Sequence, residues 1–278
     1  MLQLLSKLQH NTYEKGEFSD EQLRDLDETV RVIKDFPWDA ERALTDIQLS
    51  GPSVTILDND GNYLKLGLFF NGKFCAYYLN NHNHLYEYHA GNIDEACKLV
   101  KDFFNQTLSL KSFEKHFFNI GNKPHFTTND FVYRVNLVKV FIIAAGFSIY
   151  TICGFLLTFF SKYDLLDGSF KSFFAAFIIL MGCMICYFVI KNTDGRHQYL
   201  QISRGNNLFS YGKDEQHIIV YDKLNIEVIN YKVGNKGAIT NVEIIFKDGK
   251  FIRPRNVIDG NTLLDKFPEK LQIPKKAR

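Results

Sequence analysis

The sequence lacks the short motifs by which nucleotide-dependent and hydrolytic enzymes are commonly recognised. It has no phosphate-binding P-loop, no GxSxG nucleophile elbow and no dinucleotide-binding fingerprint. Asp58, Asp60 and Gly61 match the start of a calcium loop, but the closing glutamate is missing and a hairpin turn accounts for them better. His82 and His84 have no third metal ligand nearby in the sequence. We therefore expect no enzymatic activity, no cofactor and no metal site.

A disulfide framework is also missing, although the chain has five cysteines. Two of them, Cys75 and Cys97, fall in a predicted cytoplasmic domain, and the other three fall in long apolar runs. Cys183 and Cys186 have CxxC spacing, but within an apolar helix this spacing places them on one helix face rather than in a redox site. Helix packing is the interpretation that we favour.

Charge is absent from two long segments, Val140–Phe160 and Ser172–Ile190. About 20 apolar residues in a helix cross a hydrocarbon core roughly 30 Å thick. A short polar turn, residues 161–171, separates the two runs, so the sequence predicts a transmembrane helical hairpin over residues 136–192. Two buried helices of a soluble core are the alternative, but such helices normally keep a polar face. Without an internal charge, neither run indicates an ion path or a proton relay.

The basic residues that flank the hairpin predict its orientation. Lys and Arg concentrate on the cytoplasmic side of membrane helices. Here they lie outside the two apolar runs: Lys123, Arg134 and Lys139 before the first, and Lys191, Arg196 and Arg204 after the second. The first ten residues are too short and polar for a signal peptide, and no lipidation motif is present. We expect a two-pass protein of the bacterial inner membrane with both termini in the cytoplasm.

Small residues in the hairpin allow close helix packing. Ala144 and Ser148 have small-xxx-small spacing, and Gly154 and Gly182 also reduce side-chain bulk. Packing within the hairpin explains them, and a homo-oligomer is compatible with them. A transporter with only two spans would have to oligomerise.

Residues 1–107 predict a cytoplasmic α+β domain. Residues 2–9 suit a short helix, and a second helix capped by Ser19 or Asp20 carries apolar residues to Ile33 at helical spacing. Four strands joined by turns then form an antiparallel meander, followed by an amphipathic helix over residues 92–105. The strands are 53–57, 63–70, 74–79 and 84–89.

The two faces of this meander are both apolar or aromatic. Asn71-Gly72 predicts a two-residue type I′ turn, and the resulting register groups the tyrosines of the later strands with Tyr63, Lys65 and Phe69. That face is either covered by the N-terminal helix or exposed as a partner-binding surface. The predicted partner-binding residues are Tyr63, Phe69, Tyr78, His82, His84, Tyr86 and Tyr88.

Residues 108–135 predict a connector. The segment 108–120 alternates apolar and basic residues in a pattern typical of an amphipathic helix. Such a helix just before a membrane span either lies in the membrane interface or packs on the adjacent domain.

Residues 193–278 predict a second cytoplasmic domain, small and β-rich, with several short strands and a closing helix at 261–267. Residues 191–278 carry 16 basic and 10 acidic side chains, whereas residues 1–134 carry 14 basic and 19 acidic ones. The basic half either rests on anionic lipid or has ordinary surface charge. The predicted lipid-facing residues are Lys191, Arg196, Lys247, Lys250, Arg253 and Arg255.

Two resemblances add to this interpretation. The C-terminal pattern of two membrane helices, strands, the hairpin KDGKFIRPRNV and a closing helix resembles the bacterial pleckstrin-homology-like (PH-like) domains of the YcxB-like kind, over about residues 190–270. The N-terminal elements GPS, GNYLKL and NGKF, within residues 27–105, are similar to Bacteroidetes immunity proteins of contact-dependent, type VI-type toxins. The membrane hairpin is a departure from a plain soluble immunity domain.

These resemblances imply two functions. The first is an inner-membrane immunity protein whose N-terminal domain neutralises a cognate toxin by direct binding. The alternative is a membrane-anchored scaffold or sensor whose basic PH-like domain binds anionic lipid or a protein partner. Besides the lipid bilayer and a toxin or protein partner, we expect no nucleic-acid partner.

Overall fold

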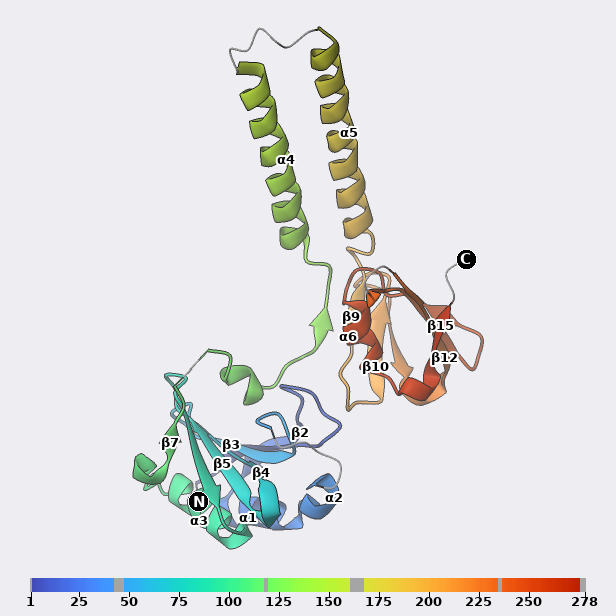
Figure 1. Cartoon of the computed structure of the whole chain (residues 1–278). Coiled ribbons are helices and arrows are strands. Elements are labelled where there is room, and N and C mark those ends of the chain that lie inside the picture. The colour runs from blue at the N-terminus through green and yellow to red at the C-terminus, as the bar shows by residue number, and fades with distance from the viewer. Residues whose placement is uncertain (1, 43–47, 118–119, 161–167, 235–236, 276–278) are drawn as a thin grey trace. The chain divides into compact units, whose positions relative to one another are not determined.

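The computed structural model of the chain describes residues 2–42, 48–117, 120–160, 168–234 and 237–275, and it has a mixed α+β architecture (Figure 1). The chain divides into two compact units. Unit 1 contains Met1–Asp130 together with Ser203–Asn206, and unit 2 contains Phe131–Ile202 together with Asn207–Arg278.

Unit 1 is built on a seven-stranded sheet, of which the predicted four-stranded meander is only a part. The strand order is β2-β1-β3-β4-β5-β6-β7 and every pair is antiparallel. The strands are β1 (Leu4–Gln9), β2 (Ser19–Arg24), β3 (Ser53–Leu57), β4 (Tyr63–Leu68), β5 (Phe74–Leu79), β6 (Leu85–Ala90) and β7 (Glu114–Lys115). The meander is present at β3–β6, and the sheet is extended at both edges.

The extra strands replace elements that the sequence predicts as helix or turn. Residues 4–9 have good helix formers, but β1 pairs with both β2 and β3, and these tertiary hydrogen bonds override local helix propensity. Ser19 and Asp20 belong to β2 rather than to a helix cap. Residues 114 and 115 pair with β6 as β7, so the amphipathic helix predicted over 108–120 is absent from its described part.

Three helices accompany the sheet: α1 (Leu26–Asp35), α2 (Trp38–Arg42) and α3 (Ile93–Phe104). A capping box between Asp25 and Glu28 starts α1, because each side chain bonds the other residue's backbone N–H. The helix ends at Asp35, because the ring of Pro37 disfavours a helical conformation at Phe36. Asn92 caps α3 by accepting the N–H of Glu95.

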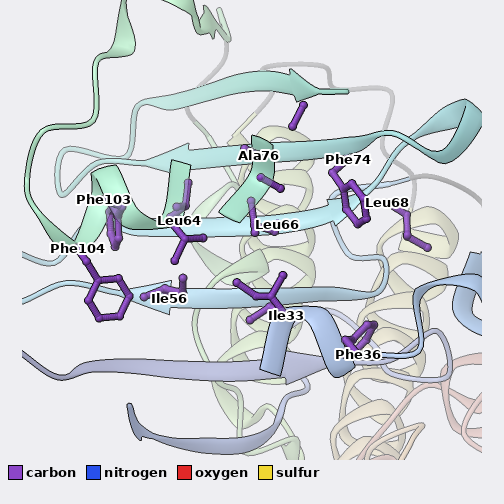
Figure 2. Close-up of a cluster of buried hydrophobic side chains, with 14 of the residues drawn as sticks. Ile33, Phe36, Ile56, Leu64, Leu66, Leu68, Phe74, Ala76, Phe103 and Phe104 are labelled. Atoms are coloured by element: carbon purple, nitrogen blue, oxygen red, sulfur yellow. The ribbon is translucent and has the colours of Figure 1, made fainter. Parts of the chain in front are cut away.

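The main core of unit 1 lies between the sheet and helices α1 and α3 (Figure 2). Ile33 from α1 and Phe103 from α3 are buried in the same cluster as Ile56, Leu64 and Leu66 from the sheet. In β4 every second residue is a leucine, and these leucines face the helices, because alternate side chains of a strand project to the same face.

The tyrosines of β5 and β6 lie on this helix-covered face, so their predicted grouping with Tyr63 and Phe69 was wrong. Leu64 pairs with Tyr78, and Tyr78 pairs with Tyr86, which places both rings on the leucine face. The β4–β5 connection is one residue longer than a two-residue turn, because Leu68 pairs with Phe74 across the 3₁₀ turn Phe70–Gly72. A shift of one residue in register moves every side chain to the opposite face.

The second face of the sheet is covered at its centre, though not by the N-terminal helix. Phe126 is fully buried there in a cluster with Cys75, Tyr77, Leu79 and Leu85. Lys65 also points to this face and is 1 % exposed. The covering segment comes from the predicted connector, residues 108–135.

Unit 2 contains two long helices, α4 (Leu137–Phe160) and α5 (Gly168–Thr193), which form the pair in Figure 1. Both are long and apolar enough to cross a membrane. Only 11 % of the most apolar window of α4 and 0 % of that of α5 are buried within the protein, which is unlike the core helix of a soluble domain. Most of the predicted connecting turn, residues 161–167, lies outside the described residues.

The rest of unit 2 has two four-stranded sheets, in the orders β11-β10-β9-β8 and β14-β13-β12-β15. The first comprises β8 (Val132–Tyr133), β9 (Tyr199–Gln201), β10 (Leu208–Gly212) and β11 (Ile218–Asp222); the second comprises β12 (Ile226–Val233), β13 (Ile239–Phe246), β14 (Phe251–Ile252) and β15 (Gln272–Lys275). These strands confirm the predicted β-rich domain, to which β8 and β15 are additions. Helix α6 (Gly260–Leu264) corresponds to the predicted closing helix.

The two sheets enclose one hydrophobic core. Phe209 from β10 stacks near Phe246 from β13, and Phe267 after α6 completes the contact. Because β8 pairs with β9, the apolar hairpin α4–α5 is inserted between two neighbouring strands of the first sheet. The end of α5 is therefore tied closely to the β-structure.

Candidate functional site

A large groove in unit 2 starts where α5 ends. Its volume is about 1170 Å³. Three segments line it: the residues that follow α5, the β10–β11 hairpin and the segment around β14. The groove therefore lies at the junction of an apolar helix and two edge strands, β11 and β14.

A glycine allows the chain to turn sharply from α5 into the groove. Gly195 has a φ of +83°, a left-handed conformation that favours glycine. A Cβ atom at this position would lie 2.4 Å from the backbone oxygen of Arg255. The end of α5 and the segment after β14 thus approach more closely than any other residue type permits.

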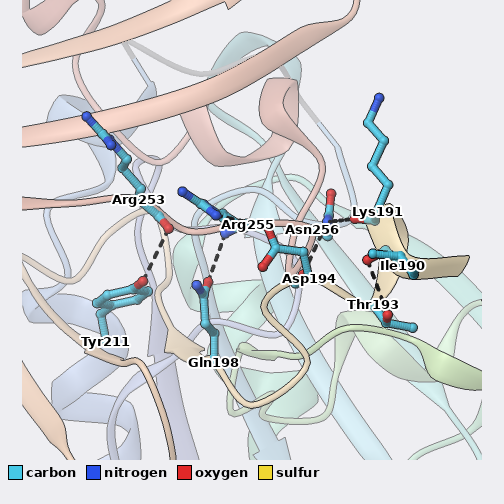
Figure 3. A network of polar contacts seen from close by, with 9 residues as sticks. All are labelled: Ile190, Lys191, Thr193, Asp194, Gln198, Tyr211, Arg253, Arg255 and Asn256. Atoms are coloured by element: carbon cyan, nitrogen blue, oxygen red, sulfur yellow. Dashed lines mark hydrogen bonds and ion pairs between the residues drawn. The ribbon is translucent and has the colours of Figure 1, made fainter. Parts of the chain in front are cut away.

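Polar contacts hold this junction together (Figure 3). The Asn256 side-chain amide donates to the backbone oxygens of Lys191 at 2.8 Å and Asp194 at 3.2 Å. The guanidinium of Arg255 lies 2.9 Å from the Asp194 carboxylate, and its backbone N–H donates to the side chain of Gln198. The last carbonyl groups of a helix lack hydrogen-bond donors within the helix, and Asn256 donates to one of them, that of Lys191.

The lining of the groove is predominantly cationic. Five lysine and arginine side chains are accompanied by two histidines and two aspartates: Arg196, Lys213, Lys250, Arg253 and Arg255, with His197 and His217, and with Asp194 and Asp214. Such a concave surface of one dominant sign attracts anionic ligands.

Two of these cations have no carboxylate partner among the described residues. Arg253 pairs with Glu243 and Lys250 pairs with Asp248, whereas no ion pair within the described part of the chain involves Arg196 or Lys213. A hydrogen bond from His217 lowers the pKa of Asp214, so this carboxylate is engaged locally. Arg196 and Lys213 are therefore the cations best available to a ligand.

Exposed apolar side chains accompany the charges. Ile219 and Phe251 line the groove and are each 56 % exposed. Val220 beside them on β11 is 62 % exposed. A surface that combines cations with exposed apolar groups suits the headgroup region of a membrane, where both kinds of group find favourable contacts.

The comparison with known families concerns this part of the chain. Residues 132–266 match the family model of a PH domain. The match supports a PH-like domain in this segment. The match begins at β8, ahead of α4, so it includes the two apolar helices and every strand of the two sheets except β15. It supports the PH-like part of the C-terminal resemblance that the sequence indicated. No curated protein and no solved structure matches the chain.

The groove of the PH-like domain brings together four of the six predicted lipid-facing residues, namely Arg196, Lys250, Arg253 and Arg255. The other two do not line it. Lys191 lies in the last turn of α5, and Lys247 donates to the backbone oxygen of Leu224 at 2.8 Å. Lipid binding by these residues stays a prediction.

Lys213 and the two histidines of the groove were missed by sequence analysis. Lys213 lies in the β10–β11 turn, 37 residues before Lys250, and nothing in the local pattern distinguishes it. The tertiary structure places it in the same groove.

The seven predicted partner-binding residues of unit 1 do not form one surface. Tyr78, Tyr86 and Tyr88 pack against the helix-covered core, while Tyr63 and Phe69 pack against the cluster on the opposite face. His82 and His84 lie apart from both groups in the β5–β6 turn. Their role in binding a partner stays a prediction.

Proposed function

We propose that this chain is a two-pass membrane protein whose PH-like domain binds the anionic headgroup of a membrane lipid. The observation that carries the proposal is the cationic groove that begins directly after α5. A ligand site attached this closely to a membrane helix meets bilayer headgroups without a search through solution.

The charges of the groove match this ligand class. A well-placed cation near an anionic bilayer contributes about 1 kcal/mol of binding free energy. Arg196 and Lys213 lack carboxylate partners in the described structure, so neutralising them requires no internal ion pair to be broken. Ile219 and Phe251 add apolar contact with the glycerol and acyl region.

The proposed location is the inner leaflet of a bacterial cytoplasmic membrane. Both apolar helices carry basic residues beyond their outer ends, and such residues stay preferentially on the cytoplasmic side. Both units would then lie in the cytoplasm, with the proposed lipid site facing anionic lipids of the inner leaflet.

A binding titration tests the proposal. The full chain, purified in a neutral detergent, is titrated with a water-soluble short-chain phosphatidylglycerol and, separately, with the matching phosphatidylcholine. We expect saturable binding of the anionic lipid that weakens with salt. The double variant Arg196→Gln/Lys213→Gln should raise the Kd about 30-fold, since two cations contribute about 2 kcal/mol.

The double variant Lys98→Gln/Lys101→Gln is the matched control, because it removes two exposed cations from α3 in unit 1. Equal affinity for both lipids, or an equal loss in the control, would overturn the proposal.

Toxin neutralisation by unit 1 is a second proposal, and one feature favours a binding role there. Hydrogen bonds order the β5–β6 turn, since the side chain of Asn80 accepts the backbone N–H groups of His82 and His84. It also contacts the β3–β4 turn, where the Asn62 side chain accepts the N–H of Asn81. Ordered adjacent turns present side chains at low entropic cost.

A pull-down with the full chain from its native host tests this second proposal. One tight partner encoded nearby, lost in a His82→Ala/His84→Ala variant and retained in a Lys98→Gln variant, would support it. Toxin-producing cells that grow normally without the protein would contradict it.

A further inference from the structure

A cysteine, a glutamate and a histidine meet on the second face of the sheet in unit 1. Cys75 comes from β5, and Glu87 and His89 come from β6. Cys75 is directly opposite His89 in the antiparallel pair. Glu87 and His89 are two residues apart and therefore project to the same face. Their potential ligand atoms all lie within 4.8 Å of one another.

A second histidine reaches the cluster from the neighbouring strand. His116 directly follows β7, and its Nε2 lies 2.7 Å from the Oε2 atom of Glu87. The other carboxylate oxygen, Oε1, lies 2.7 Å from Nε2 of His89. Glu87 is thus held between two imidazoles.

The surroundings orient the cluster. The ring of Phe69 stacks on His89 with centroids 3.9 Å apart. The two imidazoles that contact the Glu87 carboxylate, His89 and His116, hold it beside the thiol of Cys75.

Burial divides the cluster into an inner and an outer side. Cys75 is 0 % exposed, the Glu87 side chain is 20 % exposed, and the His89 side chain is 45 % exposed. A pair of histidines bound to a glutamate is a common surface arrangement that needs no thiol. The buried thiol at the base of this pair is what distinguishes the site, and the histidine side gives an ion access from solvent.

The donor atoms indicate which ion fits. Sulfur, imidazole nitrogen and carboxylate oxygen together are typical ligands of zinc, whereas magnesium and calcium take oxygen ligands. A tetrahedral zinc ion with bonds of about 2.0–2.3 Å separates its ligand atoms by roughly 3.4 Å. The present separations, up to 4.8 Å, require only side-chain adjustment to reach that value.

We propose that Cys75, Glu87 and His89 bind one zinc ion, with His116 as a positioning residue that holds the second oxygen of Glu87. Binding releases the thiol proton of Cys75, because the thiolate is the form that binds metals. Three protein ligands leave a fourth coordination position for water on the exposed side. This site is independent of the lipid groove and of the proposed functions of either unit.

Cobalt provides the direct test, because a thiolate bound to Co²⁺ produces a charge-transfer absorption. The full chain in neutral detergent is stripped of metal with a chelator and titrated with Co²⁺, then with Zn²⁺. We expect one equivalent of Co²⁺ with the thiolate absorption, followed by displacement by Zn²⁺. Absence of stoichiometric binding of either ion would overturn the proposal.

Variants locate the site. Cys75→Ser should abolish the thiolate absorption, and His89→Gln should abolish stoichiometric binding. His116→Gln should weaken zinc binding about 10- to 100-fold while one equivalent still binds, as for other residues that orient a metal ligand. Cys97→Ser and His82→Gln/His84→Gln are the controls and should bind zinc as the unmodified chain does.

Thermal unfolding of each variant shows whether it is folded. Because His89 is half exposed, His89→Gln keeps the test decisive even where Cys75→Ser disturbs the core. Binding that persists in His89→Gln, or that disappears in the His82/His84 control, would contradict the assignment.

Discussion

Two sets of cations, one in each unit of this protein, have opposite surroundings. In unit 1, Arg24 and Lys65 are 4 % and 1 % exposed and are enclosed by hydrogen-bond acceptors. In unit 2, Arg196, Lys213 and Lys250 lie exposed in a groove next to an apolar helix. The net charges of the two sequence halves do not reveal this difference. A buried cation contributes to the fold, whereas an exposed cation is available to a ligand.

The largest effect is expected at Lys65. Its ammonium donates to Gln9 at 2.7 Å and to the backbone oxygen of His125 at 3.0 Å. Burial, followed by the nearby charge of Lys7, lowers its pKa from 10.5 to about 7. Between these two values the unfolded chain holds the proton and the folded chain does not, so the free energy of unfolding rises with pH from about 7 to 10.5.

The upper limit of this rise is about 5 kcal/mol, at 1.36 kcal/mol per pKa unit. Lys65→Met should remove the slope, while Lys98→Met, on the exposed side of α3, should keep it. Hydrogen exchange of the β3 and β4 amides at pH 7 and pH 9 measures how the free energy of unfolding depends on pH in each variant. Identical slopes in the two variants would show that Lys65 is not the titrating group.

A smaller effect is expected at Arg24, whose guanidinium donates to the Ser6 hydroxyl at 2.7 Å and to the backbone oxygens of Ser6 and Asp20 at 3.1 Å. Arg24→Met should destabilise unit 1 by about 2–3 kcal/mol, because buried acceptors lose their charged donor. The exposed counterpart Arg253→Met should cost less than about 1 kcal/mol. Exchange rates of β1 and β14 amides report the two losses, and equal losses would remove the contrast between the units.

Gly195→Ala tests the junction of α5 with the groove. We expect a local loss of about 1–3 kcal/mol, because the new residue would have to keep a left-handed conformation with its Cβ against Arg255. Faster hydrogen exchange around residues 253–257 would report it. The control Gly146→Ala introduces a Cβ with nothing within 4 Å and should leave exchange there unchanged. Unchanged exchange in Gly195→Ala would contradict the tight junction.

The smallest effect on stability is expected at Lys213. Lys213→Gln should change the unfolding temperature hardly at all, because this exposed side chain has no ion pair within the described residues. Its affinity for short-chain phosphatidylglycerol should nevertheless fall about fivefold, in keeping with about 1 kcal/mol per cation. A stability loss comparable to that of Arg24→Met would mean that Lys213 belongs to the buried class.

The sequence by itself determined the features that depend on local composition. The apolar helices follow from two long runs without charge, and β3–β6 follow from alternating residues separated by turns. The β-rich C-terminal domain follows from the same kind of pattern, and four cations of its groove were among the predicted residues. These features require only that neighbouring residues share one conformational preference.

Only the tertiary structure decided the features that depend on pairing across the chain. The additional length of the β4–β5 turn placed Tyr78 and Tyr86 on the helix-covered face, and strand pairing converted the predicted helix at residues 4–9 into β1. Lys213 and Lys250 line the same groove although they are far apart in the sequence, and the register of β5 with β6 places Cys75 opposite His89. The physical reason is strand register. A shift of one residue moves every side chain of a strand to the opposite face of the sheet, and no local pattern in the sequence determines the register.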